Sequence, residues 1–115
     1  LQDFAVRWRL NPAGDSTYRD ALVQALPDSP HVDACQWQSC TPAARAQADI
    51  SALAMQLRQG LIRPQWRFEP CTDSPAHCLL VAWAGTDASA GPEGSCLDAS
   101  GQRQPGAQCT RLVLP

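Results

Sequence analysis

The chain has 115 residues, of which 44% are hydrophobic, and it carries a net charge of −2 at neutral pH. One domain of this length buries roughly two-thirds of the surface that its unfolded chain exposes, so a core is available. The nine basic residues are all arginines, scattered from Arg7 to Arg111, which argues against a phosphate-binding stripe and a nucleic-acid partner. The longest apolar run, Leu79–Ala84, is far shorter than the ~20 residues that span a bilayer.

The N-terminal segment predicts a helix. Leu1, Phe4 and Trp8 lie at positions i, i+3 and i+7 and form one apolar face. We expect this helix to end at Asn11, because Pro12 disfavours helical geometry in the residue before it. It begins without a capping residue. We therefore expect the chain to be the soluble part of a longer one, whose N-terminal segment was processed or deleted.

Two more helices are predicted before residue 61. A short one begins at Asp15 or Ser16 and stops at Pro27; residues 27–40 follow as an irregular loop rich in turn formers. The next helix spans residues 41–60, because Thr41 is a good N-cap and Gly60 a natural stop. The apolar face of the short helix consists of Tyr18, Leu22 and Leu26, and that of the long helix of Ile50, Leu53, Ala54, Leu57 and Leu61.

After residue 60 the apolar period changes from about 3.6 to 2, which predicts three strands, at residues 65–70, 77–85 and 109–114. Residues 85–108 are rich in glycine and poor in large apolar side chains, so we expect them to bury little. Helices followed by a small antiparallel sheet of three or four strands indicate a single α+β domain over residues 1–115. We expect the first helix and the 41–60 helix to pack on the sheet face that carries Trp66 or Trp83.

Six cysteines form three pairs that are close in sequence: Cys35 and Cys40, Cys71 and Cys78, and Cys96 and Cys109. In a small protein of an oxidising compartment such cysteines form disulfides, and the spacing favours a bridge within each pair. Each short loop contributes roughly 2–3 kcal/mol. Zinc is the alternative, but the spacers of four, six and twelve residues miss the C-x2-C pattern, and His31 and His77 complete no ligand set. We predict three disulfides, no metal and no cofactor.

The two histidines allow a catalytic interpretation. His31 with Asp33, and His77 with Asp73, are the candidate pairs, but no nucleophile signature accompanies them. We therefore predict solvated loop histidines, no catalytic residues and no enzyme activity.

Calcium binding and protein contact are two further candidate roles. Three carboxylates lie in the glycine-rich segment without the alternation of an EF-hand loop, which disfavours calcium; they are Asp87, Glu93 and Asp98. Of the four tryptophans, three lie on predicted apolar faces and are assigned to the core. Trp37 lies between two cysteines in a polar loop. We predict that Trp37 anchors a protein contact.

The order and spacing of several local features are similar to those of one protein family. The features are Asn11-Pro12 after the first helix, Ser39-Cys40-Thr41-Pro42 before the long helix, Asp49 within it, Cys71 and Cys78 leading into Leu79–Gly85, Cys96 in its loop, and Cys109–Pro115. Together they cover most of the chain, which resembles the type IV pilins and, among them, a PilV-type minor pilin. The N-terminal prepilin segment of that family, with its basic leader and long apolar helix, is not part of this sequence.

The resemblance implies a pilin-like α+β fold and a non-enzymatic subunit of the type IV pilus in a Gram-negative bacterium. Such a subunit is anchored in the inner membrane by its apolar helix and reaches the cell surface when it is assembled. It joins other minor pilins and pilus tip proteins in the complex that primes assembly, and it has no small-molecule substrate. Two different functions stay open: a minor pseudopilin of a type II secretion system, and an unrelated disulfide-rich secreted binding module.

Overall fold

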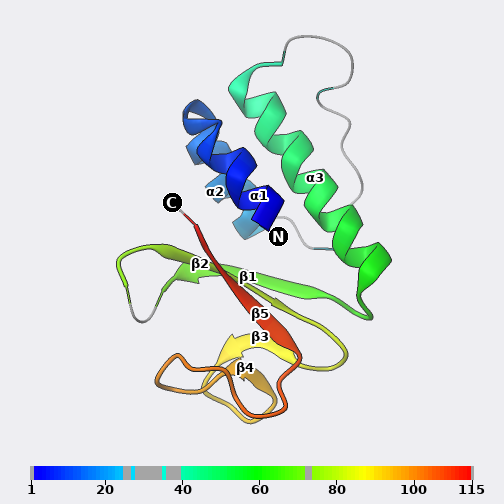
Figure 1. Cartoon of the computed structure of the whole chain (residues 1–115), viewed down its shortest axis with the longest axis vertical. Helices are drawn as coiled ribbons and strands as arrows, with labels where there is room; N and C mark the ends of the chain where they lie inside the picture. Colours follow the sequence, from blue (N-terminus) through cyan, green and yellow to red (C-terminus); the bar gives the residue numbers. More distant parts are fainter. Residues whose placement is uncertain (1, 25–26, 28–34, 36–39, 72–73, 115) are drawn as a thin grey trace. The chain divides into compact units, whose positions relative to one another are not determined.

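The computed structural model describes residues 2–24, 27, 35, 40–71 and 74–114. The chain divides into two compact units, Leu1–Gln59 and Gly60–Pro115 (Figure 1). The first unit contains the helices and the second contains the strands, which confirms the predicted α+β class. How the two units are arranged within one domain, with helices on the sheet, stays a prediction.

The helical unit begins with α1 (Gln2–Arg9), which ends two residues earlier than expected. After α1 the hydrogen bonding changes to a spacing of three residues, because the amide of Asn11 donates to the carbonyl oxygen of Trp8. Asn11 itself is not helical, with φ of −130° and ψ of 60°, as expected before a proline. A single 3₁₀ turn, Pro12–Gly14, leads into α2 (Asp15–Gln24).

Three aromatic rings from α1 and α2 form the centre of the helical unit. Trp8 stacks on Tyr18 with 4.8 Å between ring centroids, and Phe4 meets both rings edge-on. Edge-on and stacked geometries are the favoured ones for aromatic pairs. The indole Nε1 of Trp8 donates to Asp15 Oδ1 at 2.8 Å. The predicted apolar face of α1 is thus confirmed at Phe4 and Trp8, and Leu1 lies outside the described residues.

The long helix α3 spans Pro42–Gly60, as the capping residues predict. The amide of Ala44 donates to Thr41 Oγ1 at 3.1 Å, so Thr41 is the N-cap. The predicted stripe is confirmed at Ile50, Leu53, Ala54 and Leu57, whereas Leu61 follows the helix and is half-buried. The buried face also includes Ala46, Asp49 and Ser51.

The second unit is built on a three-stranded antiparallel sheet in the order β1-β2-β5. Its strands are β1 (Gln65–Pro70), β2 (His77–Ala82) and β5 (Cys109–Leu114). The bounds of β1 and β5 are those predicted. The strand β2 ends three residues early, because Ala84 and Gly85 have positive φ values of 54° and 92° and turn the chain away.

Residues 85–108 contain two short strands that sequence patterning misses, β3 (Asp87–Ala90) and β4 (Ser95–Leu97), which pair in parallel. This segment packs on one face of the sheet through a few side chains. Ala88, Ser95, Cys96 and Leu97 are its buried residues, which agrees with the expectation that it buries little. The buried cluster consists of Leu80, Ala82, Ala88, Cys96, Leu97 and Cys109. Its members from the segment are small side chains and one leucine, and the Cys96–Cys109 disulfide holds them close enough to the sheet to pack without large residues.

The three predicted disulfides are confirmed. Cys35 bonds to Cys40 before α3, Cys71 bonds to Cys78 across the β1–β2 turn, and Cys96 in β4 bonds to Cys109 in β5. The first bridge lies in the helical unit and the other two in the strand unit. Of the helices that the structure describes, none has the length and apolar character that crossing a bilayer requires.

Candidate functional site

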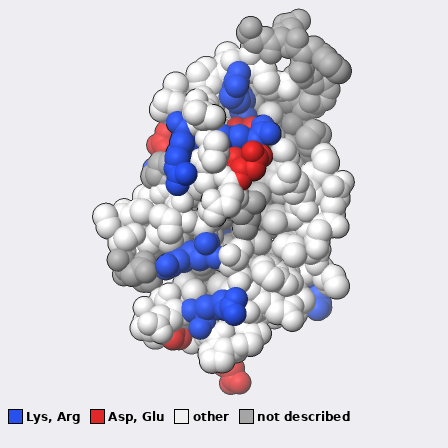
Figure 2. All heavy atoms as spheres, in the orientation of Figure 1, with Lys and Arg blue, Asp and Glu red and all other residues white. Residues whose placement is uncertain are grey.

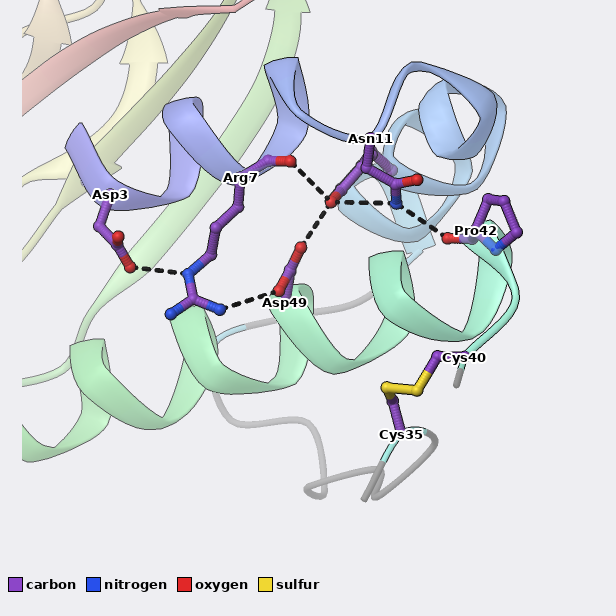
Figure 3. A network of polar contacts seen from close by, with 8 residues as sticks. Asp3, Arg7, Asn11, Cys35, Cys40, Pro42 and Asp49 are labelled. Carbon is purple, nitrogen blue, oxygen red and sulfur yellow. Dashed lines mark hydrogen bonds and ion pairs between the residues drawn. A yellow bond between two sulfur atoms is a disulfide. The ribbon is translucent and has the colours of Figure 1, made fainter. Parts of the chain in front are cut away.

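A buried carboxylate organises the polar contacts of the helical unit (Figure 3). Asp49 lies in the middle of α3 and is only 6% exposed. The hydroxyl of Tyr18 donates to its Oδ2 at 2.5 Å, and Arg7 Nη1 donates to its Oδ1 at 3.4 Å. All three helices therefore meet at one side chain. A buried charge requires such partners.

The same network joins the end of α1 to the start of α3. Asn11 Nδ2 donates to the carbonyl oxygen of Pro42 at 2.9 Å and also lies 3.4 Å from the Tyr18 hydroxyl (Figure 3). A Cβ at Gly14 would lie 2.6 Å from Asn11 Nδ2 and 2.8 Å from the carbonyl oxygen of Pro42. A side chain at position 14 would therefore disturb this hydrogen bond, which explains the glycine there.

The electrostatics of the network keep the phenol neutral. Burial raises the pKa of Tyr18 to about 12, and the hydrogen bond that its hydroxyl donates to Asp49 adds to the rise. The pKa of Arg7 is raised as well, first by its hydrogen bond to Asp3 at 2.8 Å. A fully buried, neutral phenol that donates to a carboxylate is a stabilising element. The arrangement fixes the positions of α1, α2 and α3 within the helical unit.

A small pocket opens beside this network, between α1 and α3. Its volume is about 40 Å³, and it is lined by Asp3, Phe4, Arg7, Asp49, Ala52, Leu53 and Gln56. A water molecule needs roughly 10–15 Å³ of such space, and small-molecule sites are several times larger. This pocket therefore accommodates a few water molecules and not an organic substrate.

Of the two histidines and their candidate partners Asp33 and Asp73, the structure describes His77 alone. His77 lies in β2, is half-buried and stacks on Phe68 with 5.2 Å between the rings, so the prediction of a solvated loop histidine is wrong for this residue. His31, Asp33 and Asp73 lie outside the described residues. Within the described part of the chain, no three residues among His, Cys, Asp and Glu are grouped to hold a metal ion.

Asp98, one of the three carboxylates of the glycine-rich segment, forms hydrogen bonds with residues close to it in sequence. Its Oδ1 accepts hydrogen bonds from the backbone amides of Ser100 and Gln102 and from the Ser100 hydroxyl. These bonds, that of the Ser100 side chain first, lower the pKa of Asp98. The carboxylate stabilises its own turn.

Of the three tryptophans that the sequence assigns to the core, two are buried and the third is not. Trp8 and Trp66 are buried, and Trp83 is half-buried after β2. Trp37 lies outside the described residues, so its predicted role as a contact anchor is not tested.

The segment between β2 and β5 presents an exposed tip of defined shape. Residues 91–94 are exposed between the strands β3 and β4. Behind the tip, Gln104 Nε2 donates to the carbonyl oxygens of Pro92 and Leu97 at 2.9 and 3.0 Å, and the hydroxyls of Ser89 and Ser95 are 2.7 Å apart. Few hydrogen bonds of this kind are expected of an unstructured loop. These hydrogen bonds give the tip a defined conformation.

Three of the nine arginines are paired with carboxylates close in sequence. Arg7, Arg19 and Arg67 each form an ion pair, with Asp3, Asp15 and Glu69 at 2.8–2.9 Å. The basic side chains on the face drawn in Figure 2 lie in separate groups, several of them next to acidic ones. This distribution gives no support to a nucleic-acid surface.

Comparison with models of known protein families, with curated proteins and with solved structures finds no match to this chain. The functional interpretation therefore depends on the residues themselves. The network around Asp49 is the feature that sequence reasoning missed as a site. Its signal was an acidic residue within the apolar stripe of the long helix, four residues before Leu53.

Proposed function

We propose that this chain is the globular head of a type IV pilus minor pilin of the PilV type, which contributes to priming of pilus assembly and to the tip complex. The observation that carries the proposal is the order of its parts. A helical unit precedes an antiparallel β1-β2-β5 sheet, and a disulfide-closed segment connects β2 to β5. The resemblance in the sequence implies this same order.

The exposed apolar residues of α1 are consistent with a helix that continues N-terminally into an assembly helix. Val6 and Leu10 are 47% and 79% exposed, although both are apolar. They lie four residues apart, on the side of α1 opposite to the buried Phe4 and Trp8. In the proposal, α1 continues N-terminally into an apolar helix that anchors the subunit in the inner membrane and later joins neighbouring subunits.

The head would contact its neighbours through its disulfide-tied segments, around Trp37 and at residues 85–108. The tip at residues 91–94 is held by Gln104, so little ordering entropy is lost when it is covered. Contacts between heads alone should be small and weak, because most of the association energy resides in the apolar helix.

The proposed partners are other minor pilins and pilus tip proteins, with no nucleic acid and no small-molecule substrate. The subunit would reside in the inner membrane and periplasm before assembly and on the cell surface afterwards. Three disulfides fit that route, because they persist in oxidising compartments. It would act by binding, without catalysis.

Deletion of the full-length gene tests the proposal. Surface pili, counted by electron microscopy, should fall in the deletion strain while the total amount of major pilin stays unchanged. The full-length gene should restore piliation, and a version that encodes the head without its apolar helix should not, although that head folds.

Two results of the same experiment would contradict the proposal. Normal piliation in the deletion strain excludes an assembly role. Normal piliation together with loss of a secreted protein from the medium would instead identify a pseudopilin of a type II secretion system.

A further inference from the structure

The three disulfides differ in the exposure of their cysteine residues. Cys96 and Cys109 are 1% and 2% exposed, inside the apolar cluster of the strand unit. Cys78 is 2% exposed, although its partner Cys71 is partly exposed. Only Cys35–Cys40 has two partly exposed cysteines among these bridges. Thiol exchange requires a thiolate to reach a sulfur, so access favours this bridge.

The position of Cys40 is a second reason to expect thiol exchange at the Cys35–Cys40 bridge. Cys40 directly precedes Thr41, the N-cap of the 19-residue helix α3. The N-terminus of a helix stabilises a thiolate and lowers the pKa of a thiol nearby. A thiol with a lowered pKa is the better leaving group in exchange. When a thiolate attacks this bridge, Cys40 is therefore the sulfur that should leave.

We propose that Cys35–Cys40 is a thiol-exchange site that reacts with small thiols of the glutathione class while the other two bridges stay closed. The thiolate attacks Cys35 Sγ, the bond to Cys40 Sγ breaks, and Cys40 departs as a thiolate. A second thiol then attacks the mixed disulfide on Cys35. The protein gains two electrons, and the two thiols are oxidised to one disulfide. This site is independent of the proposed pilus role.

The helical unit can keep its fold while this bridge is open. The start of α3 is held by the Thr41 cap and by the hydrogen bond that Asn11 Nδ2 donates to the carbonyl oxygen of Pro42 at 2.9 Å. Neither contact involves a cysteine sulfur. In Figure 3 the bridge lies beside the start of α3, at the edge of the network around Asp49. Exchange should therefore leave the buried contacts of Asp49 in place.

Peptide mapping of the native protein tests the site. The protein with its three disulfides is incubated with reduced glutathione, quenched with an alkylating reagent at timed intervals, and digested for mass spectrometry. The first product should carry glutathione on Cys35 and the alkyl group on Cys40. The other four cysteines should remain bridged, reacting at least tenfold more slowly. In denaturant this difference between the bridges should disappear.

A double variant, Cys35→Ser with Cys40→Ser, is the matched control. It should incorporate no glutathione over the same interval, with both remaining bridges intact. Opening of Cys71–Cys78 or Cys96–Cys109 first, or at the same rate, would overturn the proposal. Glutathione found on Cys40, with Cys35 alkylated, would overturn the assignment of the leaving sulfur.

Discussion

The buried centre of the helical unit includes a polar network, in which Asp49, Tyr18 and Asn11 form hydrogen bonds next to the stacked aromatic rings. In the strand unit the buried centre is a disulfide, Cys96–Cys109, surrounded by small apolar side chains. Both units are similar in size, with 59 and 56 residues, yet they use different interactions to hold their segments together.

The difference follows from the secondary structure of each unit. Helices satisfy their backbone hydrogen bonds internally, so only side chains can fix how α1, α2 and α3 meet. The hydrogen bond from Tyr18 to Asp49 spans 31 residues of sequence. Strands are joined by backbone bonds, and here the segment that covers them is short of large apolar residues. A covalent bridge holds that segment in place.

The largest expected effect concerns the apolar stripe of α3. Leu57→Ala should lower the free energy of unfolding by about 2–5 kcal/mol, because it removes a buried side chain and leaves a cavity. Denaturant titration followed by circular dichroism measures it. Gln47→Ala, an exposed change on the same helix, should have little effect. An unchanged midpoint for Leu57→Ala would show that this stripe is not part of the core.

Removal of the buried bridge should act on the strand unit. Replacing both Cys96 and Cys109 by alanine should cost about 3 kcal/mol, the value for a loop of this length. Hydrogen exchange should then speed up at the amides of β3 and β4, with smaller changes in α3. The same replacement of Cys35 and Cys40 should leave β3 and β4 protected. Equal loss of protection in both units would refute the contrast drawn between them.

The hydroxyl of Tyr18 should make the helical unit sensitive to alkali. Its pKa is raised to about 12, above the unfolded value of about 10. The folded state thus keeps a proton that the unfolded state loses. The resulting stabilisation is fully present below pH 10 and decreases as the pH rises to 12, by up to about 1.4 kcal/mol per pH unit.

Tyr18 is the only tyrosine of the chain, so tyrosinate absorbance reports its ionisation alone. Tyr18→Phe should remove the alkaline dependence and cost about 1–3 kcal/mol at neutral pH, because the Asp49 carboxylate loses a buried donor. A titration midpoint near 10 in the folded protein would mean that the phenol is solvated.

The smallest expected effect concerns the turn after β2. Ala84 has a φ of 54°, a conformation that costs a non-glycine residue about 1–2 kcal/mol. Ala84→Gly should relieve this strain and, after the greater entropy of the unfolded chain is subtracted, raise the thermal midpoint slightly. Ala90→Gly, in the exposed end of β3, should lower it. A lower midpoint for Ala84→Gly would show that the turn is unstrained.

The helices and strands that are set by local sequence signals, such as capping residues and alternating apolar residues, could be predicted from the sequence. Thr41 and Gly60 bound α3, and alternation of apolar residues gives β1 and β5 with the observed bounds. The strands β3 and β4 have no such pattern, since they consist mostly of small residues. The contacts around them include the Cys96–Cys109 disulfide and the hydrogen bond from Gln104 to the carbonyl oxygen of Leu97, neither of which is visible in side-chain periodicity.

The network around Asp49 could not be predicted from the sequence, for a different reason. Asp49 could be seen as an acidic residue in an apolar stripe, but its partners Arg7 and Tyr18 are 42 and 31 residues away. A single sequence does not indicate which distant residue satisfies a buried charge. The disulfides were predictable because each pair is local, with separations of 5, 7 and 13 residues.

Cell fractionation of the full-length protein tests the pilin proposal most directly. With an apolar helix of ~20 or more residues ahead of α1, the protein should remain with inner membranes after salt washing and be released only by detergent. Its mature N-terminus, read by mass spectrometry, should lie before that apolar helix. A protein recovered in the periplasmic or secreted fraction, with a mature N-terminus at Leu1, would contradict the proposal and identify a secreted module.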